Sequence, residues 1–210
     1  MAQFFVIHPE NPQQRLIHQV VEIIRNGGVI IYPTDASYAI GCGLGDKEAQ
    51  QRIRAIRGKG EDHPFTLVCR DLAEISIYAK VDNRQFRLLK ANTPGCYTFI
   101  LEATREVPKR LQHPKRKTIG LRVPAHPILQ ALLAELNEPL LSTTLQLPGD
   151  EQPLNDPYEI RELLEHQVDL VLDGGYGDVE TTTVIDLTGE VPVLVRAGKG
   201  DINPFGLEKE

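Results

Sequence analysis

The order in which apolar segments and amphipathic segments follow one another is the feature that most limits the fold of this chain. A strand expected at 28–32 (GVIIY) precedes a helix at 47–57, in which Ala49, Ile53 and Ile56 recur at helical spacing. Such alternation continues through the first part of the chain, whereas strand candidates cluster near its end. This order is typical of an α/β protein, and the late cluster predicts a twisted mixed sheet with flanking helices.

The remaining elements are placed from their caps and apolar runs. Asn11 and Pro12 predict the start of a helix, and Asp46, Asp71 and Asp82 each precede another. Further helices are expected at 126–136 and 157–166. The other expected strands lie at residues 4–8, 65–69, 97–101, 118–123, 139–143, 168–175, 181–187 and 191–198. Because no linker or repeat interrupts this pattern, we expect one domain over residues 1–210, with a core at about 10–200.

Composition limits the classes of protein to be considered. No apolar run approaches the roughly 20 residues of a membrane helix, so no membrane partner is expected. The first residues lack the pattern of a signal peptide. Three widely spaced cysteines, Cys42, Cys69 and Cys96, are expected to be reduced thiols. Together these features predict a cytoplasmic protein.

Charge is distributed unevenly along the chain. The net charge of −6 argues against polyanion binding over the whole surface. Positive charge nevertheless gathers at 52–59 (RIRAIRGK) and 108–122 (PKRLQHPKRKTIGLR), whereas acidic residues dominate near 150–165. The molecule is therefore expected to have a basic face and an acidic face.

Hydroxyl side chains recur at the ends of three expected strands. They belong to 34–38, 142–144 and 181–183. Each cluster alone is explained by the preference of threonine for strands and of serine for turns. Three clusters together point instead to a nucleotide polyphosphate, whose oxygens hydroxyl and guanidinium groups bind. The cations at loop or strand ends that support this interpretation are Arg57, Lys59, Arg122 and Arg196.

Several familiar sites are absent from the sequence. It contains neither G-x-x-x-x-G-K-[ST] nor G-x-G-x-x-G, the two common phosphate-binding loops. No H-x-x-x-H or C-x-x-C motif occurs, so no metal site is expected. Nothing in the pattern singles out a Ser–His or Cys–His nucleophile.

Seven segments, in chain order, resemble the signature of the YrdC/YciO-like family, which includes the threonylcarbamoyl-AMP synthases. They are GGVIIYPTDASYAIGC (27–42), IRGKGEDHPF (56–65), NTPGCYTFIL (92–101), TIGLRVPAHP (118–127), PLLSTTLQLPG (139–149), TTTVIDLTG (181–189) and VLVRAG (193–198). The resemblance covers about residues 10–200 and is strongest to the YciO branch. The sequence departs from the family pattern in the reversed order of Arg57 and Lys59, and in Thr144-Leu145-Gln146, which stands where the family has S-A-N.

The resemblance implies a YrdC-like fold with a large concave, positively charged cavity. It also implies a nucleotidyltransferase that converts threonine, bicarbonate and ATP into threonylcarbamoyl-AMP and pyrophosphate for tRNA modification. Carried over by position, Thr34, Arg122 and Thr182 would hold threonine. The residues that would hold ATP are Arg57, Lys59, His63, Thr118, Thr144 and Arg196. Magnesium would bind through the phosphates, and no catalytic nucleophile is expected, because positioning and cationic stabilisation carry this chemistry.

An alternative function is double-stranded RNA binding without catalysis. A-form RNA is recognised largely through phosphates and 2′-hydroxyls, which a basic concave surface can contact. The candidate residues are Lys109, Arg110, Lys115, Arg116 and Lys117. Aromatic residues make up only 6% of the chain, which limits stacking on unpaired bases, and a solvated loop is an equally good interpretation of so short a run. A third alternative is a binding protein that retains the nucleotide cavity but carries out no chemistry.

Overall fold

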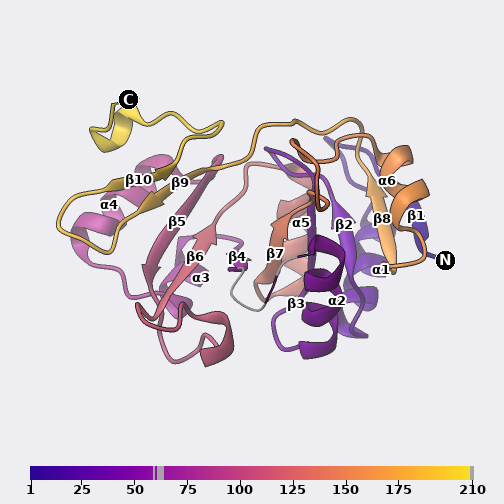
Figure 1. Ribbon diagram of the computed structural model, residues 1–210, viewed down its shortest axis with the longest axis horizontal. Helices are drawn as coiled ribbons and strands as arrows, with labels where there is room; N and C mark the ends of the chain where they lie inside the picture. The colour runs from indigo at the N-terminus through magenta and orange to yellow at the C-terminus, as the bar shows by residue number, and fades with distance from the viewer. Residues whose placement is uncertain (59, 61–63, 209–210) are drawn as a thin grey trace.

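A computed structural model describes residues 1–58, 60 and 64–208 and contains one ten-stranded sheet (Figure 1). The strands are β1 (Gln3–Val6), β2 (Ile30–Tyr32), β3 (Ala39–Gly43), β4 (Thr66–Val68), β5 (Tyr97–Glu102), β6 (Thr118–Arg122), β7 (Leu140–Thr144), β8 (Leu170–Asp173), β9 (Thr183–Asp186) and β10 (Val193–Arg196). The helices are α1 (Gln14–Arg25), α2 (Lys47–Arg57), α3 (Leu72–Tyr78), α4 (Asn83–Asn92), α5 (Pro127–Leu136) and α6 (Pro157–Leu164), with 3-10 turns η1 (Lys109–Leu111) and η2 (Asn203–Phe205).

The strands lie in the order β1-β8-β2-β3-β7-β4-β6-β5-β9-β10. The pairs β1–β8, β2–β8, β4–β6 and β5–β9 are parallel, and the remaining neighbours are antiparallel. The predicted mixed α/β sheet is therefore confirmed. Because parallel neighbours need a long crossover, strands that are distant in sequence lie side by side, and polar residues from distant segments can meet.

Two apolar clusters cover opposite faces of β2. Alternate side chains of a strand point to opposite faces, so Ile30 and Tyr32 pack with α1 and α5, whereas Val29 and Ile31 belong to the cluster of the other face. α2 lies against β3 and α6 against β8. Of the helices in the described residues, none is both long enough and apolar enough to cross a membrane.

Three of the four predicted helix caps are confirmed. The carboxylates of Asp46, Asp71 and Asp82 each accept a hydrogen bond from the backbone N–H three residues further on, at 2.8, 2.9 and 2.7 Å respectively. The prediction that Asn11 caps the first helix is wrong. Its backbone N–H donates to His8 Nδ1 at 3.0 Å, so Asn11 belongs to a turn that precedes α1.

The sequence did not predict strand β3, because two of its five residues, Gly41 and Gly43, belong to a type that is depleted in strands. Gly41 is needed where it lies. A Cβ added there would come within 2.7 Å of the Leu141 carbonyl oxygen and 3.1 Å of the Tyr32 ring. A strand glycine of this kind marks a close approach of neighbouring groups.

Candidate functional site

A cavity of about 1060 Å³ lies between two groups of elements. Residues of α2, β3 and β7 line one side, and residues of β5, β6 and β9 and of the segment 109–116 line the other. The cationic lining residues are Lys47, Arg54, Arg57, Lys109, Arg110, Arg116, Arg122 and Arg196. Among the described lining residues there is no Asp or Glu. The cavity therefore favours a ligand that carries negative charge.

The predicted hydroxyl clusters contribute to this cavity. Ser142, Thr143 and Thr144 line it, as do Thr181 and Thr182. β7 lies beside β3 and β4, whereas the threonines at 181–182 precede β9 on the far side of β5. The sheet order therefore brings these two clusters to one cavity.

Thr34 occupies a different position. Its hydroxyl donates to the Ser37 carbonyl oxygen at 2.6 Å and accepts from the Ala36 backbone N–H at 2.9 Å. These bonds fix the turn between β2 and β3. Ala36 and Ser37 line the cavity, whereas Thr34 is not among the lining residues. The hydroxyl of Thr34 thus shapes the loop, and its role in threonine binding stays a prediction.

Arg122 is a buried cation of the cavity that is held by an ion pair. Arg122 is only 8% exposed, and its Nη2 forms a hydrogen bond and an ion pair with Asp35 Oδ1. The Nε atom is buried without a hydrogen-bond partner among the described residues. One N–H of the Arg122 guanidinium is therefore not used as a donor by the described residues.

Thr182 lies next to a predicted ATP-binding residue. Its Oγ1 is 2.8 Å from Thr98 Oγ1, and Arg196 Nη2 donates to the Thr182 carbonyl oxygen at 2.9 Å. Burial lowers the pKa of Arg196 and likewise that of Arg57, which donates to the Gln146 carbonyl oxygen at 2.8 Å. Both guanidiniums remain charged, because arginine does not lose its proton in proteins.

The other predicted ATP-binding residues fall into two groups. Thr118 and Thr144 line the cavity. Lys59 and His63 lie outside the described residues, whereas Gly60 and Pro64 line the cavity.

The basic segment predicted for RNA binding forms one wall of the cavity. Lys109, Arg110 and Arg116 line it, whereas Lys115 and Lys117 do not. The wall contacts its neighbours on both sides. Arg110 Nε donates to Gln50 Oε1 of α2 at 3.2 Å, and Arg116 forms an ion pair with Asp186 of β9. Three of the five candidates thus face the same space as the predicted nucleotide site, and RNA binding stays a prediction.

The three thiols are poorly suited to nucleophilic attack. Cys42 and Cys69 are buried, and burial raises the pKa of Cys69 and brings that of Cys42 to about 12. Cys96 is half-buried with its pKa raised to about 11. No group of His, Cys, Asp and Glu side chains among the residues the structure describes is arranged to hold a metal ion.

Two neighbours of the predicted residues were not identified from the sequence. Asp35 was noted only as part of its loop, and Arg54 only as part of a basic run. Arg54 places its guanidinium 5.1 Å from the centre of the Phe65 ring, and both residues line the cavity. A charged residue in this loop, Asp35, is visible in the sequence. Its partner Arg122 is 87 positions away, so the sequence does not show that the two residues form a pair.

Comparison with known proteins gives the relationships of the chain. The Sua5/YciO/YrdC family model, described as "Telomere recombination", matches residues 22–198. The uncharacterized protein YciO of Escherichia coli K12 is 62% identical over 205 residues, which cover 98% of this chain and all of that protein. The crystal structure of E. coli YciO superimposes with a TM-score of 0.94 at 61% identity, over 98% of this chain and 100% of that one.

More distant relatives have named activities or ligands. A threonylcarbamoyl-AMP synthase of Halorhodospira halophila is 29% identical over 172 residues, which are 81% of this chain and 88% of that protein. Sua5 of P. abyssi, in complex with L-threonine, superimposes with a TM-score of 0.85 at 25% identity, over 93% of this chain and 57% of that one. This protein therefore belongs to the Sua5/YciO/YrdC family and has a fold like that of the threonylcarbamoyl-AMP synthases.

Proposed function

We propose that this protein is a threonylcarbamoyl-AMP synthase, which forms threonylcarbamoyl-AMP and pyrophosphate from L-threonine, bicarbonate and Mg·ATP. The observation that carries the proposal is the cavity in which Arg122 of β6 and the residues Thr182 and Arg196 at the paired strands β9 and β10 come together from two distant segments. Its lining by cations without a described carboxylate fits a triphosphate. Sua5 of P. abyssi, a relative of the same fold, has been solved with L-threonine.

The reaction needs positioning more than covalent help. Bicarbonate gives CO₂ and hydroxide. The neutral threonine amine adds to the carbon of CO₂, and the proton that it loses combines with this hydroxide to form water and leave a carbamate. A carbamate oxygen then attacks the α-phosphorus, and the bond to the β,γ-phosphates breaks to release pyrophosphate. Negative charge develops on the phosphate oxygens, where Arg57 and Arg196 supply fixed positive charge.

In this proposal the threonine carboxylate binds Arg122, and Thr182 lies between the two substrates. Thr182 suits that place because its carbonyl oxygen accepts from Arg196 while its hydroxyl contacts Thr98. Thr118 and Thr144 offer hydroxyls to the nucleotide. Magnesium arrives with ATP through its phosphates, as part of the substrate.

The proposal is tested by measuring pyrophosphate release from ATP with threonine and bicarbonate present together, singly or omitted. We expect release only when both are present. Arg196→Ala should weaken ATP binding by about ten- to a hundredfold, because it removes a charge-assisted hydrogen bond. Arg105→Ala, which removes an arginine side chain that is 95% exposed, is the matched control and should leave ATP binding unchanged. ATP binding without threonine-dependent release would refute the proposed reaction.

A further inference from the structure

Asp35 is the centre of a contact network at the Arg122 part of the cavity. Its Oδ1 accepts from Arg122, and its Oδ2 accepts from the Ala125 backbone N–H at 2.8 Å. Its carbonyl oxygen accepts from Cys96 Sγ at 3.1 Å and from Lys199 Nζ at 3.0 Å. The side chains of Asp35 and Arg122 are only 7% and 10% exposed. One residue thus joins the β2–β3 loop to three distant segments.

The charges around Asp35 balance. The Lys199 ammonium forms a second ion pair, with Asp178 at 2.8 Å. We call Asp35, Arg122, Asp178 and Lys199 the Asp35 cluster; it contains two cations and two carboxylates. Burial raises the pKa of Cys96 to about 11 and lowers that of His126, so neither neighbour adds charge near neutral pH. The Asp35 cluster is therefore electrically neutral.

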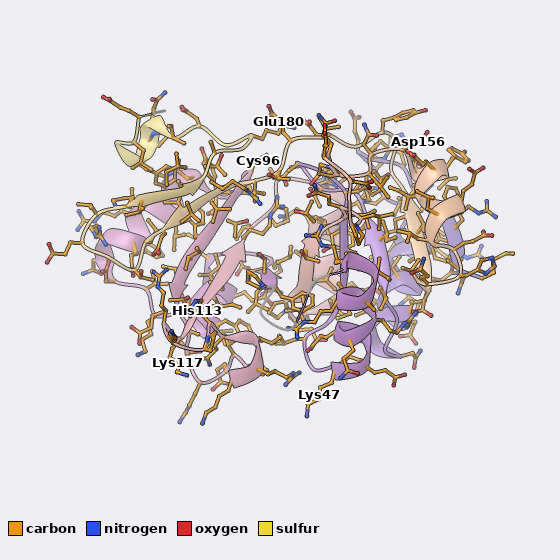
Figure 2. All side chains as sticks on the ribbon, viewed as in Figure 1. Lys47, Cys96, His113, Lys117, Asp156 and Glu180 are labelled. Atoms are coloured by element: carbon orange, nitrogen blue, oxygen red, sulfur yellow. The ribbon has the colours of Figure 1, made fainter. Side chains whose placement is uncertain are left out.

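The other end of the cavity is different. Lys47 and Arg54 of α2 and Lys109 and Arg110 of η1 line it, and none of them forms an ion pair with a described carboxylate. Figure 2 shows the separation, with Cys96, which contacts Asp35, near the top and Lys47 at the bottom. The cavity thus combines a part where the charges of the Asp35 cluster balance with a part whose cations have no ion-pair partner among the described residues.

We propose that Asp35 reserves the Arg122 end of the cavity for a zwitterionic α-amino acid and excludes phosphate from it. This inference rests on the proposed function and adds the origin of its substrate selectivity. An arginine without a carboxylate partner would attract a phosphate as strongly as the other cations do. A phosphate at Arg122 would lie beside the Asp35 carboxylate, and the repulsion between like charges would oppose its binding.

An α-amino acid avoids this repulsion. Its carboxylate can accept from the guanidinium of Arg122, which lines the cavity and whose Nε has no partner among the described residues. Its ammonium compensates the added negative charge, so the ligand brings no net charge into a buried, balanced cluster. Asp35 is thus a positioning residue. It holds the guanidinium of Arg122 and determines which net charge a ligand of this guanidinium can have.

The test compares wild type, Asp35→Asn and the matched control Asp186→Asn. The control also removes a carboxylate from a cavity-lining arginine, because Asp186 pairs with Arg116. Threonine and inorganic phosphate are titrated separately and in competition by calorimetry, and thermal melting is followed with and without phosphate. We expect Asp35→Asn to bind threonine about tenfold more weakly and to acquire phosphate binding that competes with threonine. Wild type and Asp186→Asn should show no such competition.

Two further variants locate the effect. Asp35→Ser removes the same charge with a smaller side chain and is measured in parallel, so that poor folding of one replacement does not decide the result. In Asp35→Asn/Arg122→Gln the acquired phosphate site should disappear, because the unbalanced guanidinium is gone. Phosphate should raise the melting temperatures of Asp35→Asn and Asp35→Ser more than that of wild type, because phosphate replaces the lost carboxylate as a partner of Arg122.

The outcomes separate this inference from the proposed function. If neither charge-removing variant acquires a phosphate site that depends on Arg122, the role given to Asp35 is refuted. If wild type binds no threonine, the proposed function is refuted, and the phosphate comparison among the variants still decides whether Asp35 excludes anions.

Discussion

Replacing Gly41 by alanine should destabilise the centre of the sheet. Its added Cβ would lie 2.7 Å from the carbonyl oxygen of Leu141 and 3.1 Å from both Cε1 and the hydroxyl oxygen of Tyr32. Neither neighbour can move freely. Leu141 belongs to the β7 ladder beside β3, and the fully buried Tyr32 is hydrogen-bonded to Ser142. The strands must therefore separate or the Tyr32 hydrogen bond must weaken.

Overpacking of this kind costs about 1–3 kcal/mol. For a domain of about 200 residues, each kcal/mol lowers the melting temperature by about 2–4 °C, so Gly41→Ala should melt about 2–12 °C below wild type. Differential scanning calorimetry of the purified protein measures the shift. Gly45→Ala is the matched control, because a Cβ at Gly45 meets nothing within 4 Å and Gly45 does not have a positive φ.

The comparison between the two alanine variants decides the result. Gly45→Ala should melt within a degree or two of wild type, because exposed substitutions away from special features usually change stability by less than about 0.5 kcal/mol. Equal melting temperatures for Gly41→Ala and Gly45→Ala would refute the argument that the approach between β3, β7 and Tyr32 requires glycine.

Two further predictions concern Cys96 and Phe205. Burial raises the pKa of Cys96 from 9.0 to about 11, so at pH 8 its alkylation by iodoacetamide should be about a hundredfold slower than that of a free thiol. The rate of alkylation should increase up to about pH 11. Mass spectrometry measures this rate, and a rate equal to that of Cys96 in the urea-unfolded chain would contradict the prediction. Phe205 is 6% exposed, and the centre of its ring lies 5.4 Å from that of Tyr97 and 5.9 Å from that of Phe99. Phe205→Ala should therefore lower the free energy of unfolding, measured by heat or urea, by about 3 kcal/mol. A loss below about 1 kcal/mol would show that the turn η2 does not stabilise β5.

Local signals in the sequence were sufficient for most of the fold. Asp46, Asp71 and Asp82 were correctly identified as caps, because a carboxylate that precedes an amphipathic segment satisfies the first free N–H groups whatever the rest of the protein does. Asn11 and strand β3 could not be placed by such rules. Asn11 is engaged by His8, and the glycine at position 41 is required by Leu141 and Tyr32, contacts that only the folded sheet creates.

The candidate site was partly predictable for the same reason. Thr144 and Thr182 carry hydroxyls at strand ends, a pattern that the amino-acid sequence alone shows, and both line the cavity. The partner of Arg122 was not visible, because no local rule joins position 35 to position 122. Charge balance within a site is a property of the assembled sheet, so residue type alone identified the cations but not the carboxylate that restrains one of them.

The order of strands also determines when the site can form during synthesis of the chain. β1 pairs only with β8, and β5 has an open edge until β9 pairs with it, so both ends of the sheet depend on the last third of the sequence (Figure 1). Thr182 and Arg196 lie in that same third. A nascent chain that ends before β9 therefore exposes an unpaired edge and has no complete site, so a ligand can stabilise only the completed chain.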